Sequence, residues 1–321
     1  MASRHTTLGS RQSITAILLG LVVAWTPFGC TTIKDTAKGT VRTVSESSRK
    51  VADAITPGGA GIKRKLTLIG IETRPETGQA DFGAHFSQTM SDYLQNECKE
   101  ALLDEAVGAI LRSPPRLASG QIDGYSLAMM GRPRGINYFV IGSLTDVRFL
   151  DEKTGFWLWK KTRYRIRATL RVEIVDSAEG AKSLDETFWD EMVIDETAYE
   201  TLKEAGAIPL TEILPVLARL LREAGYKTCA TLRNQPWQGF ITAADQNRLT
   251  ISAGSAVGLS PGKGLEVFDR GRVVEGKDGR RFLKPGDKIG EARIESVSAD
   301  QAEAVLSQPA AVAAGGTVQL K

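Results

Sequence analysis

The sequence predicts an α+β protein, in which a mixed sheet with flanking helices is followed by a small antiparallel β-barrel domain. Residues 163–174 alternate between polar side chains, mostly arginine, and apolar ones, which is the period of a half-buried strand. Residues 209–232 place leucine and isoleucine at the spacing of an amphipathic helix. From Asn234 onward, short apolar runs alternate with glycine-rich turns, a pattern typical of a small barrel.

The first domain is expected at residues 63–232. It opens with the apolar run 66–71, a predicted core strand. Apolar residues then recur at helical spacing from about 81 to 103, which predicts a helix with Asp81 as its N-cap. The other elements expected here are a short helix at 121–130, a buried strand at 138–147 and a returning strand at 183–194.

The second domain is expected at residues 233–321. Its turns contain the segments 258–264 and 283–287, where glycine and proline interrupt the chain. The strands expected in this barrel lie at 237–243, 248–252, 264–269, 272–275, 288–298, 301–307 and 317–321.

The N-terminus has the pattern of a secretory signal peptide over residues 1–29. Arg4 and Arg11 precede an uncharged apolar run at 14–25, and small residues follow near a cleavage point. The run is shorter than the roughly 20 apolar residues that a membrane-spanning helix needs. The chain is therefore predicted to be exported.

The pair Gly29-Cys30 resembles the end of a bacterial lipobox, although Pro27 stands where that pattern has leucine. The resemblance implies that the Cys30 thiol carries fatty acid such as palmitate and becomes the new N-terminus. Thr31 in place of aspartate implies the periplasmic face of the outer membrane. The alternative is ordinary cleavage nearby, which would leave a soluble periplasmic protein.

Residues 30–62 are rich in threonine, serine, lysine and alanine, with a glycine-rich segment near their end at 55–61, and are predicted to be a flexible tether. A tether of about 30 residues has a mean reach on the order of 30 Å.

The whole chain has 41 Lys+Arg and 38 Asp+Glu, and removal of the leader takes only Arg4 and Arg11 from this balance. A nearly neutral mature chain argues against a nucleic-acid partner.

Two cysteines remain once Cys30 is assigned to the lipid anchor. Cys98 and Cys229 form an even pair in an oxidising compartment, so they are candidates for a disulfide. The alternative is two buried thiols on separate elements, and sequence alone does not choose between them.

Enzyme signatures are missing from the sequence. The mature chain has one histidine, His85, within a predicted helix, and no nucleophile is paired with it by a recognisable motif. There is no His/Cys spacing of a zinc site and no phosphate-binding loop. We therefore expect no catalytic residue, no metal and no cofactor.

Several motifs carry a family resemblance. The strand at 66–71, the segment 135–145 (GINYFVIGSLT) and the hairpin 170–180 resemble curli-secretion lipoproteins, penicillin-binding-protein activators and the middle domain of flagellar assembly protein T. Segments 247–268 and 290–297 resemble the C-terminal domain of flagellar assembly protein T. The resemblance implies a mixed sheet flanked by helices, followed by a β domain.

The segment 148–162 is the candidate for the amphipathic hairpin that each subunit of a curli-type pore inserts into the outer membrane. It is too short for the hairpins of a membrane pore, each strand of which takes about 9–11 residues. Phe156, Trp157 and Trp159 are expected either to form an exposed aromatic tip, which contacts a partner or a membrane, or to fold onto the protein's own core.

The strand that follows carries a basic face made by Arg163, Arg165 and Arg167. One hypothesis is a solvated face paired with carboxylates such as Asp185, Glu186 and Glu191. The other is a binding surface for an anionic partner, such as lipid headgroups or a cell-wall polymer.

Together these features predict a non-enzymatic lipoprotein, anchored in the membrane by lipid, that acts as an assembly or scaffolding factor for an envelope machine such as the flagellar basal body. The envelope partner is not identified, and a homo-oligomer is compatible with the sequence. The alternatives are a subunit of a curli-type export channel and a contact activator of a cell-wall synthase.

Overall fold

The computed structural model describes residues 61–71, 81–111, 113–156, 159 and 161–321. The predicted signal peptide, Cys30 and nearly all of the predicted tether lie outside the described residues. Thr56–Lys321 form one compact unit, so the predicted domain boundary at residue 233 stays a prediction. Ile62, the last residue assigned to the tether, is buried in the barrel core.

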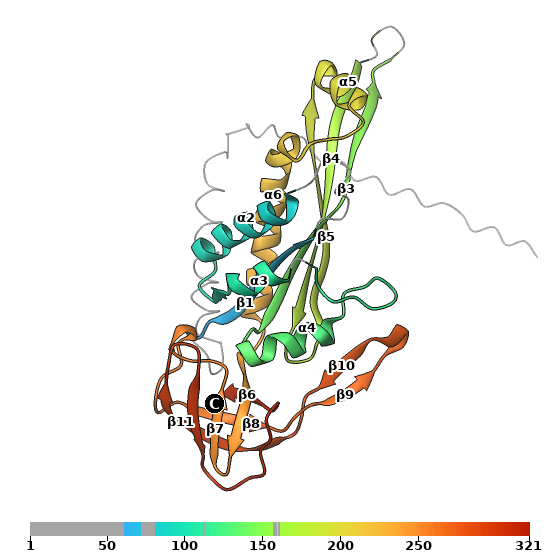
Figure 1. The fold of residues 1–321 in the computed structure, drawn as a ribbon. Helices are drawn as coiled ribbons and strands as arrows, with labels where there is room; N and C mark the ends of the chain where they lie inside the picture. The colour runs from blue at the N-terminus through green and yellow to red at the C-terminus, as the bar shows by residue number, and fades with distance from the viewer. Residues whose placement is uncertain (1–60, 72–80, 112, 157–158, 160) are drawn as a thin grey trace, which may run out of the picture. The chain divides into compact units, whose positions relative to one another are not determined.

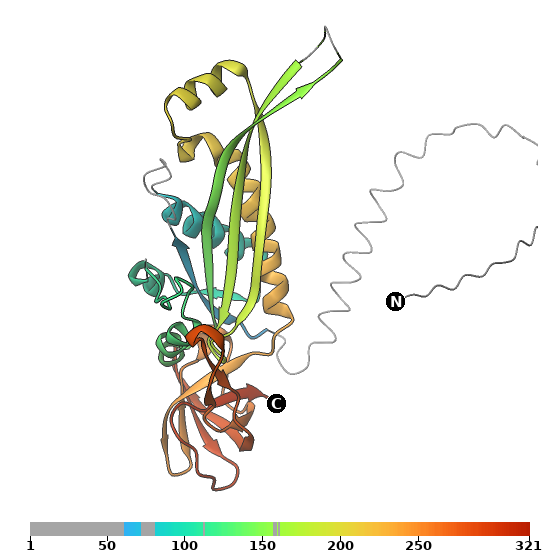
Figure 2. The same ribbon diagram turned by 90° about the vertical axis from the view of Figure 1, so that its right-hand side faces the viewer.

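The first sheet is mixed, as predicted, with strand order β2-β1-β3-β4-β5. β1 (Arg64–Ile71) pairs in parallel with β2 (Ala101–Leu103) and with β3 (Tyr138–Thr154). β3, β4 (Lys161–Asp176) and β5 (Lys182–Ile194) are antiparallel. β3 and β4 form a long hairpin, visible in Figures 1 and 2.

Helices cover the sheet because its strands bury alternate residues on two faces. α2 (Phe82–Glu97) and α6 (Leu210–Arg233) pack on the face that carries Leu170 and Val172, and Figure 1 shows both helices on one side of the sheet. α3 (Glu105–Ile110) and α4 (Gly124–Gly131) pack on the opposite face through a smaller core that contains Phe139. The described residues also form α5 (Glu196–Glu204) and the 3₁₀ turns η2 (Arg132–Arg134), η3 (Ser255–Val257) and η4 (Lys277–Gly279).

The predicted helix at 81–103 is too long. α2 ends at Glu97, where Cys98 adopts an extended backbone, and residues 101–103 instead form β2. They do so because β1 offers them a parallel strand to pair with. Local helical spacing does not reveal such a distant hydrogen-bonding partner.

The second sheet is the expected barrel. Six strands close in the order β11-β12-β7-β6-β13-β8 around a core that contains Leu265 and Ile294. Closure pairs every strand of the barrel with two neighbours, which leaves no open edge. The strands are β6 (Gln238–Asp245), β7 (Arg248–Ile251), β8 (Gly264–Phe268), β11 (Lys288–Val297), β12 (Ala302–Leu306) and β13 (Thr317–Leu320).

One strand expected in the barrel is not part of it. Residues 272–275 form β9 (Arg272–Glu275), which pairs with β10 (Arg281–Lys284) in a separate two-stranded sheet. The chain leaves the barrel after Phe268 and returns at Lys288, and Gly286 allows the two connecting segments to approach closely at Asp269. Figure 1 shows this hairpin extending from the barrel.

Buried polar side chains connect the mixed sheet to the barrel. The Asn137 side chain accepts a hydrogen bond from Lys65 N at 2.9 Å and donates one to Gln238 O at 2.6 Å. Arg132 donates to Gly315 O at 2.6 Å, and its guanidinium lies 5.0 Å from the centre of the Phe240 ring. Because buried polar groups need partners, these contacts fix how the barrel attaches to the sheet.

Candidate binding surface

The end of the β3–β4 hairpin presents two aromatic side chains to solvent. Phe156 is 88% exposed and Trp159 is 84% exposed, and Trp159 N donates to Phe156 O at 3.1 Å. These two side chains therefore do not fold onto the core. Trp157 lies outside the described residues.

The hairpin is supported on one face below this end. The Tyr199 ring of α5 stacks on Tyr164 at 4.3 Å and meets Phe149 edge-on at 5.3 Å, as measured between ring centroids. Tyr199 is itself buried, although it lies on a helix with mostly exposed residues. The aromatic cluster braces β3 and β4 where they extend beyond the core.

The opposite face carries the arginines, and carboxylates neutralise most of them. Arg165 donates to Glu191 at 2.9 Å and to Glu152 at 2.6 Å. Arg167 Nε donates to the same Glu191 at 2.8 Å. Arg163 is exposed, and no salt bridge to it is present in the part of the chain that the structure describes. The basic face seen in the sequence is thus largely a network of ion pairs.

The network continues toward the base of the strands. Arg171 binds Asp185 through two parallel hydrogen bonds of 2.8 Å each, and Lys182 donates to the same carboxylate at 2.9 Å. The bonds from Arg171 and Lys182 lower the pKa of Asp185 to about 2. This carboxylate therefore stays charged over the physiological range.

Two residues of this face were missed by sequence reasoning. Trp189 is 60% exposed and Val193 is 70% exposed, both on β5, and the Arg167 guanidinium lies 4.6 Å from the centre of the Trp189 ring. The sequence contains a pattern that could have identified them, because the two-residue period of a strand places residues 189, 191 and 193 on one face. The face thus combines ion pairs with exposed apolar surface.

A cavity of 860 Å³ lies at the carboxyl end of β1, between α2 and α3. Two of the acidic residues that line it already have structural roles. Asp104 caps α3 by accepting from Val107 N at 3.4 Å, and Glu105 accepts from Ser91 Oγ at 3.4 Å. His85 lies on α2, where burial lowers its pKa. The described residues contain no cluster of three or more His, Cys, Asp or Glu placed to hold a metal.

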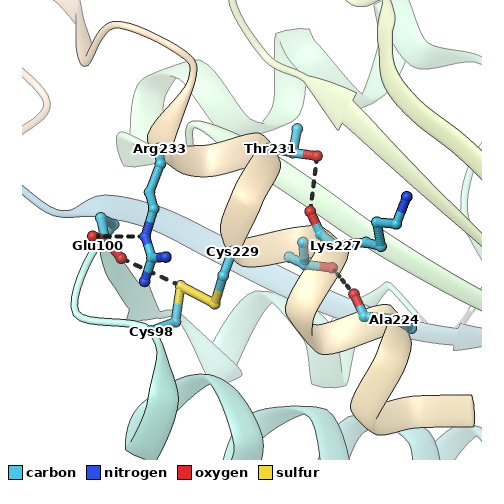
Figure 3. Close-up of a disulfide and its surroundings, with 8 residues drawn as sticks. Cys98, Glu100, Ala224, Lys227, Cys229, Thr231 and Arg233 are labelled. Atoms are coloured by element: carbon cyan, nitrogen blue, oxygen red, sulfur yellow. Dashed lines mark hydrogen bonds and ion pairs between the residues drawn. A yellow bond between two sulfur atoms is a disulfide. The ribbon is translucent and has the colours of Figure 1, made fainter. Parts of the chain in front are cut away.

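Cys98 and Cys229 are joined in a disulfide, with their Cα atoms 5.7 Å apart. Figure 3 shows the bond between the end of α2 and α6, with the ion pair of Arg233 and Glu100 beside it. The sequence did not show whether these two cysteines lie close enough to bond, and the packing of α2 on α6 brings them together.

Among the described helices, none combines the length and apolar character needed to cross a membrane.

Comparisons with known proteins give only distant likenesses. No family model matches the chain, and no curated protein matches it. A hypothetical protein, CT253, from Chlamydia trachomatis is 17% identical, with 53% of this chain and 98% of that chain covered and a TM-score of 0.33.

Two lipoproteins are also among the similar solved structures. A minor lipoprotein from Acinetobacter baumannii is 12% identical over 53% of this chain and 92% of its own, with a TM-score of 0.24. Lipoprotein GNA1162 from Neisseria meningitidis is 9% identical over 44% of this chain and 94% of its own, with a TM-score of 0.26. Such low scores carry no argument about function, and the more specific resemblance to curli-secretion and flagellar proteins stays a prediction.

Proposed function

We propose that this protein is a lipid-anchored envelope protein that works by binding, as an assembly or scaffolding factor for an envelope machine. Cys30 carries the lipid at the periplasmic face of the outer membrane, and the tether allows the folded unit to reach a partner. The end of the β3–β4 hairpin makes the contact.

One observation supports this proposal above the others. Phe156 and Trp159 are almost fully exposed at the end of a hairpin that α5 braces. Large aromatic side chains contribute most to binding when a partner buries them, and exposing them without a partner costs free energy. Their exposure at the end of a supported hairpin suits recognition better than catalysis.

Co-purification from detergent-solubilised envelopes, with the lipid anchor intact, tests the contact. The variant carries both Phe156→Ser and Trp159→Ser, and Tyr226→Ser on α6 is the control because Tyr226 is also exposed. We expect components of one envelope machine to co-purify with the wild-type chain and the control and to be depleted at least about tenfold from the double variant. Equal recovery with the double variant would remove the hairpin from the proposal.

The anchor needs a separate measurement. Cells labelled with radioactive palmitate should incorporate label into the wild-type chain and none into Cys30→Ala. Outer-membrane fractions should contain the wild-type chain, and the variant should move to the soluble periplasmic fraction. An unlabelled wild-type chain would contradict the lipid anchor, whatever the result for the hairpin.

A further inference from the structure

The β9–β10 hairpin has an open strand edge. In the part of the chain that the structure describes, β9 pairs with β10 and with no other strand. All four residues of β9, Arg272–Glu275, are exposed. Exposed edges of this kind can accept a further strand from another chain.

The register identifies the backbone groups at this edge. Gly276 N donates to Arg280 O at 2.7 Å, and successive residues of an antiparallel ladder direct their hydrogen-bonding groups alternately toward and away from the partner strand. Val274 therefore bonds to β10, whereas Val273 and Glu275 direct N–H and C=O outward. Leu283 of β10 fits the same alternation, because its N–H bonds outward to Glu179 O at 2.8 Å.

The first sheet and its helices already occupy the other edge of the hairpin. Besides the bond from Leu283 to Glu179, Arg281 forms a 3.4 Å ion pair with Asp123. Its guanidinium also lies 4.3 Å from the centre of the Tyr125 ring on α4. These contacts hold β10 in place, so a further strand has access at β9.

The charges beside the open edge are unbalanced. Arg272 lies directly opposite Lys284 in the ladder, and like charges in that position destabilise a strand pair. Neither residue, nor the neighbouring Arg270, has a salt bridge within the described ranges. An anionic partner would remove this repulsion.

The opposite face of the hairpin borders a hollow with a mixed lining. Val273 and Leu283 lie on that face and, with Met129 and Tyr125 of α4, form the apolar part of a cavity of 570 Å³, whose rim also includes the basic residues Arg132, Arg270 and Arg272 and the acidic Asp269. Met129 and Val273 are each about half exposed. A strand added to β9 would direct alternate side chains into this hollow and toward Arg272.

We propose that β9 binds an extended acidic segment of a partner protein by strand addition. The segment would alternate apolar and acidic residues: apolar side chains enter the hollow beside Met129, and carboxylates meet Arg272 and Lys284. This site lies on a different element from the aromatic end of the β3–β4 hairpin, so it goes beyond the proposed function and does not depend on the lipid anchor.

Fluorescence anisotropy with a short labelled peptide in which glutamate alternates with leucine tests the proposal on the purified full-length mature chain. Val273→Pro removes the outward N–H and leaves the bonds between β9 and β10 intact, because proline is tolerated where the N–H faces solvent. We expect Val273→Pro to weaken binding at least about fivefold, as the loss of a backbone hydrogen bond does. Circular dichroism spectra of this variant should match those of the wild-type chain.

A charge exchange gives the second arm. In the double variant Arg272→Glu and Lys284→Glu, the affinity for the glutamate peptide should fall by about tenfold or more. Its affinity for the same peptide with lysine in place of glutamate should rise. Arg293→Glu, an exposed residue of β11, is the matched control and should change neither affinity by more than about twofold. Rescue by the lysine peptide would not follow from a folding defect.

Three results would overturn the proposal. Unchanged binding by Val273→Pro would show that the strand edge is not used. Equal affinity of the wild-type chain for the glutamate and lysine peptides would remove the charge complementarity. Self-association by sedimentation velocity that is lost in Val273→Pro, with no peptide binding by the wild-type chain, would assign the edge to a second copy of the chain.

Discussion

Cys98 is bonded to Cys229, which is 131 residues away in the sequence and lies on α6. The bond ties the end of α2 to the helix beside it within the main hydrophobic core. It therefore closes a loop that contains most of the mixed sheet.

Replacing both cysteines by serine should lower the free energy of unfolding by about 2–5 kcal/mol. A loop of this length restricts the unfolded chain strongly, and removal of native disulfides from folded domains has costs in that range. Urea unfolding measures the change. The wild-type chain with reduced thiols is the control and should show nearly the same loss; an unchanged midpoint would mean that the bond does not stabilise the fold.

Asn137→Ala should lower the free energy of unfolding by about 2–3 kcal/mol. The change leaves Lys65 N and Gln238 O without the hydrogen bonds that the amide makes, and each unsatisfied buried group costs about 1–3 kcal/mol. Denaturant titration measures this. Thr242→Ala is the control, because Thr242 makes a single side-chain bond on the barrel strand β6, and a loss as large as that of Asn137→Ala would contradict the special role of the amide.

Asp176 should make stability depend on pH. Burial raises the pKa of Asp176 to about 6 in the folded chain, above its ordinary value of 3.8. The folded state therefore binds the proton more tightly, so this contribution to stability is fully present below about pH 4 and is lost as the pH rises through about 6.

Asp176→Asn should remove that loss. Its free energy of unfolding should exceed that of the wild-type chain by about 1–3 kcal/mol at pH 7.5, with a much smaller difference at pH 4. Chemical denaturation at a series of pH values gives the comparison. Glu179→Gln is the control: it removes a neighbouring charge that raises the Asp176 pKa, so it should move the transition slightly to lower pH. If the difference in free energy of unfolding between Asp176→Asn and the wild-type chain did not change between pH 4 and pH 6.5, the prediction would be contradicted.

Glu191→Gln should destabilise the sheet and increase binding to anionic surfaces. Both Arg165 and Arg167 donate to Glu191, so the change leaves two arginines without part of their neutralising charge. We expect a loss of about 1–2 kcal/mol in the free energy of unfolding, together with stronger co-sedimentation with anionic phospholipid vesicles at low salt.

The control for this variant is Glu186→Gln. Glu186 pairs with Lys227 in a single exposed ion pair, which contributes about 0–1 kcal/mol. If the wild-type chain already bound anionic vesicles as tightly as Glu191→Gln, the arginine face would be a binding surface in its own right, and its neutralisation by carboxylates would not matter.

Much of the fold could be predicted from local pattern. The alternation along β4 and the leucine face of α6 each require only neighbouring residues, and the structure has both elements close to the predicted positions. The extent of β3 could not be predicted, because its last residues are mostly exposed and gain their strand conformation from pairing with β4.

The candidate binding surface was predictable only in part. Phe156 and Trp159 stand out in the sequence as aromatic residues between two strands, but their exposure depends on how far the hairpin extends. The arginines of β4 also stand out, yet the register with β5 decides that Arg167 lies opposite Glu191. No local pattern fixes which carboxylate lies opposite a given arginine.

The sequence by itself determined the class of each half of the chain and the export pattern that ends at Cys30, because strand and helix periods and leader composition are properties of adjacent residues. The tertiary structure alone decided that residues 101–103 leave the helix to pair with β1, that β9 and β10 lie outside the barrel, and that Cys98 meets Cys229. Those outcomes depend on hydrogen bonds and contacts between segments far apart in the chain, whose free energy exists only once both partners are in place.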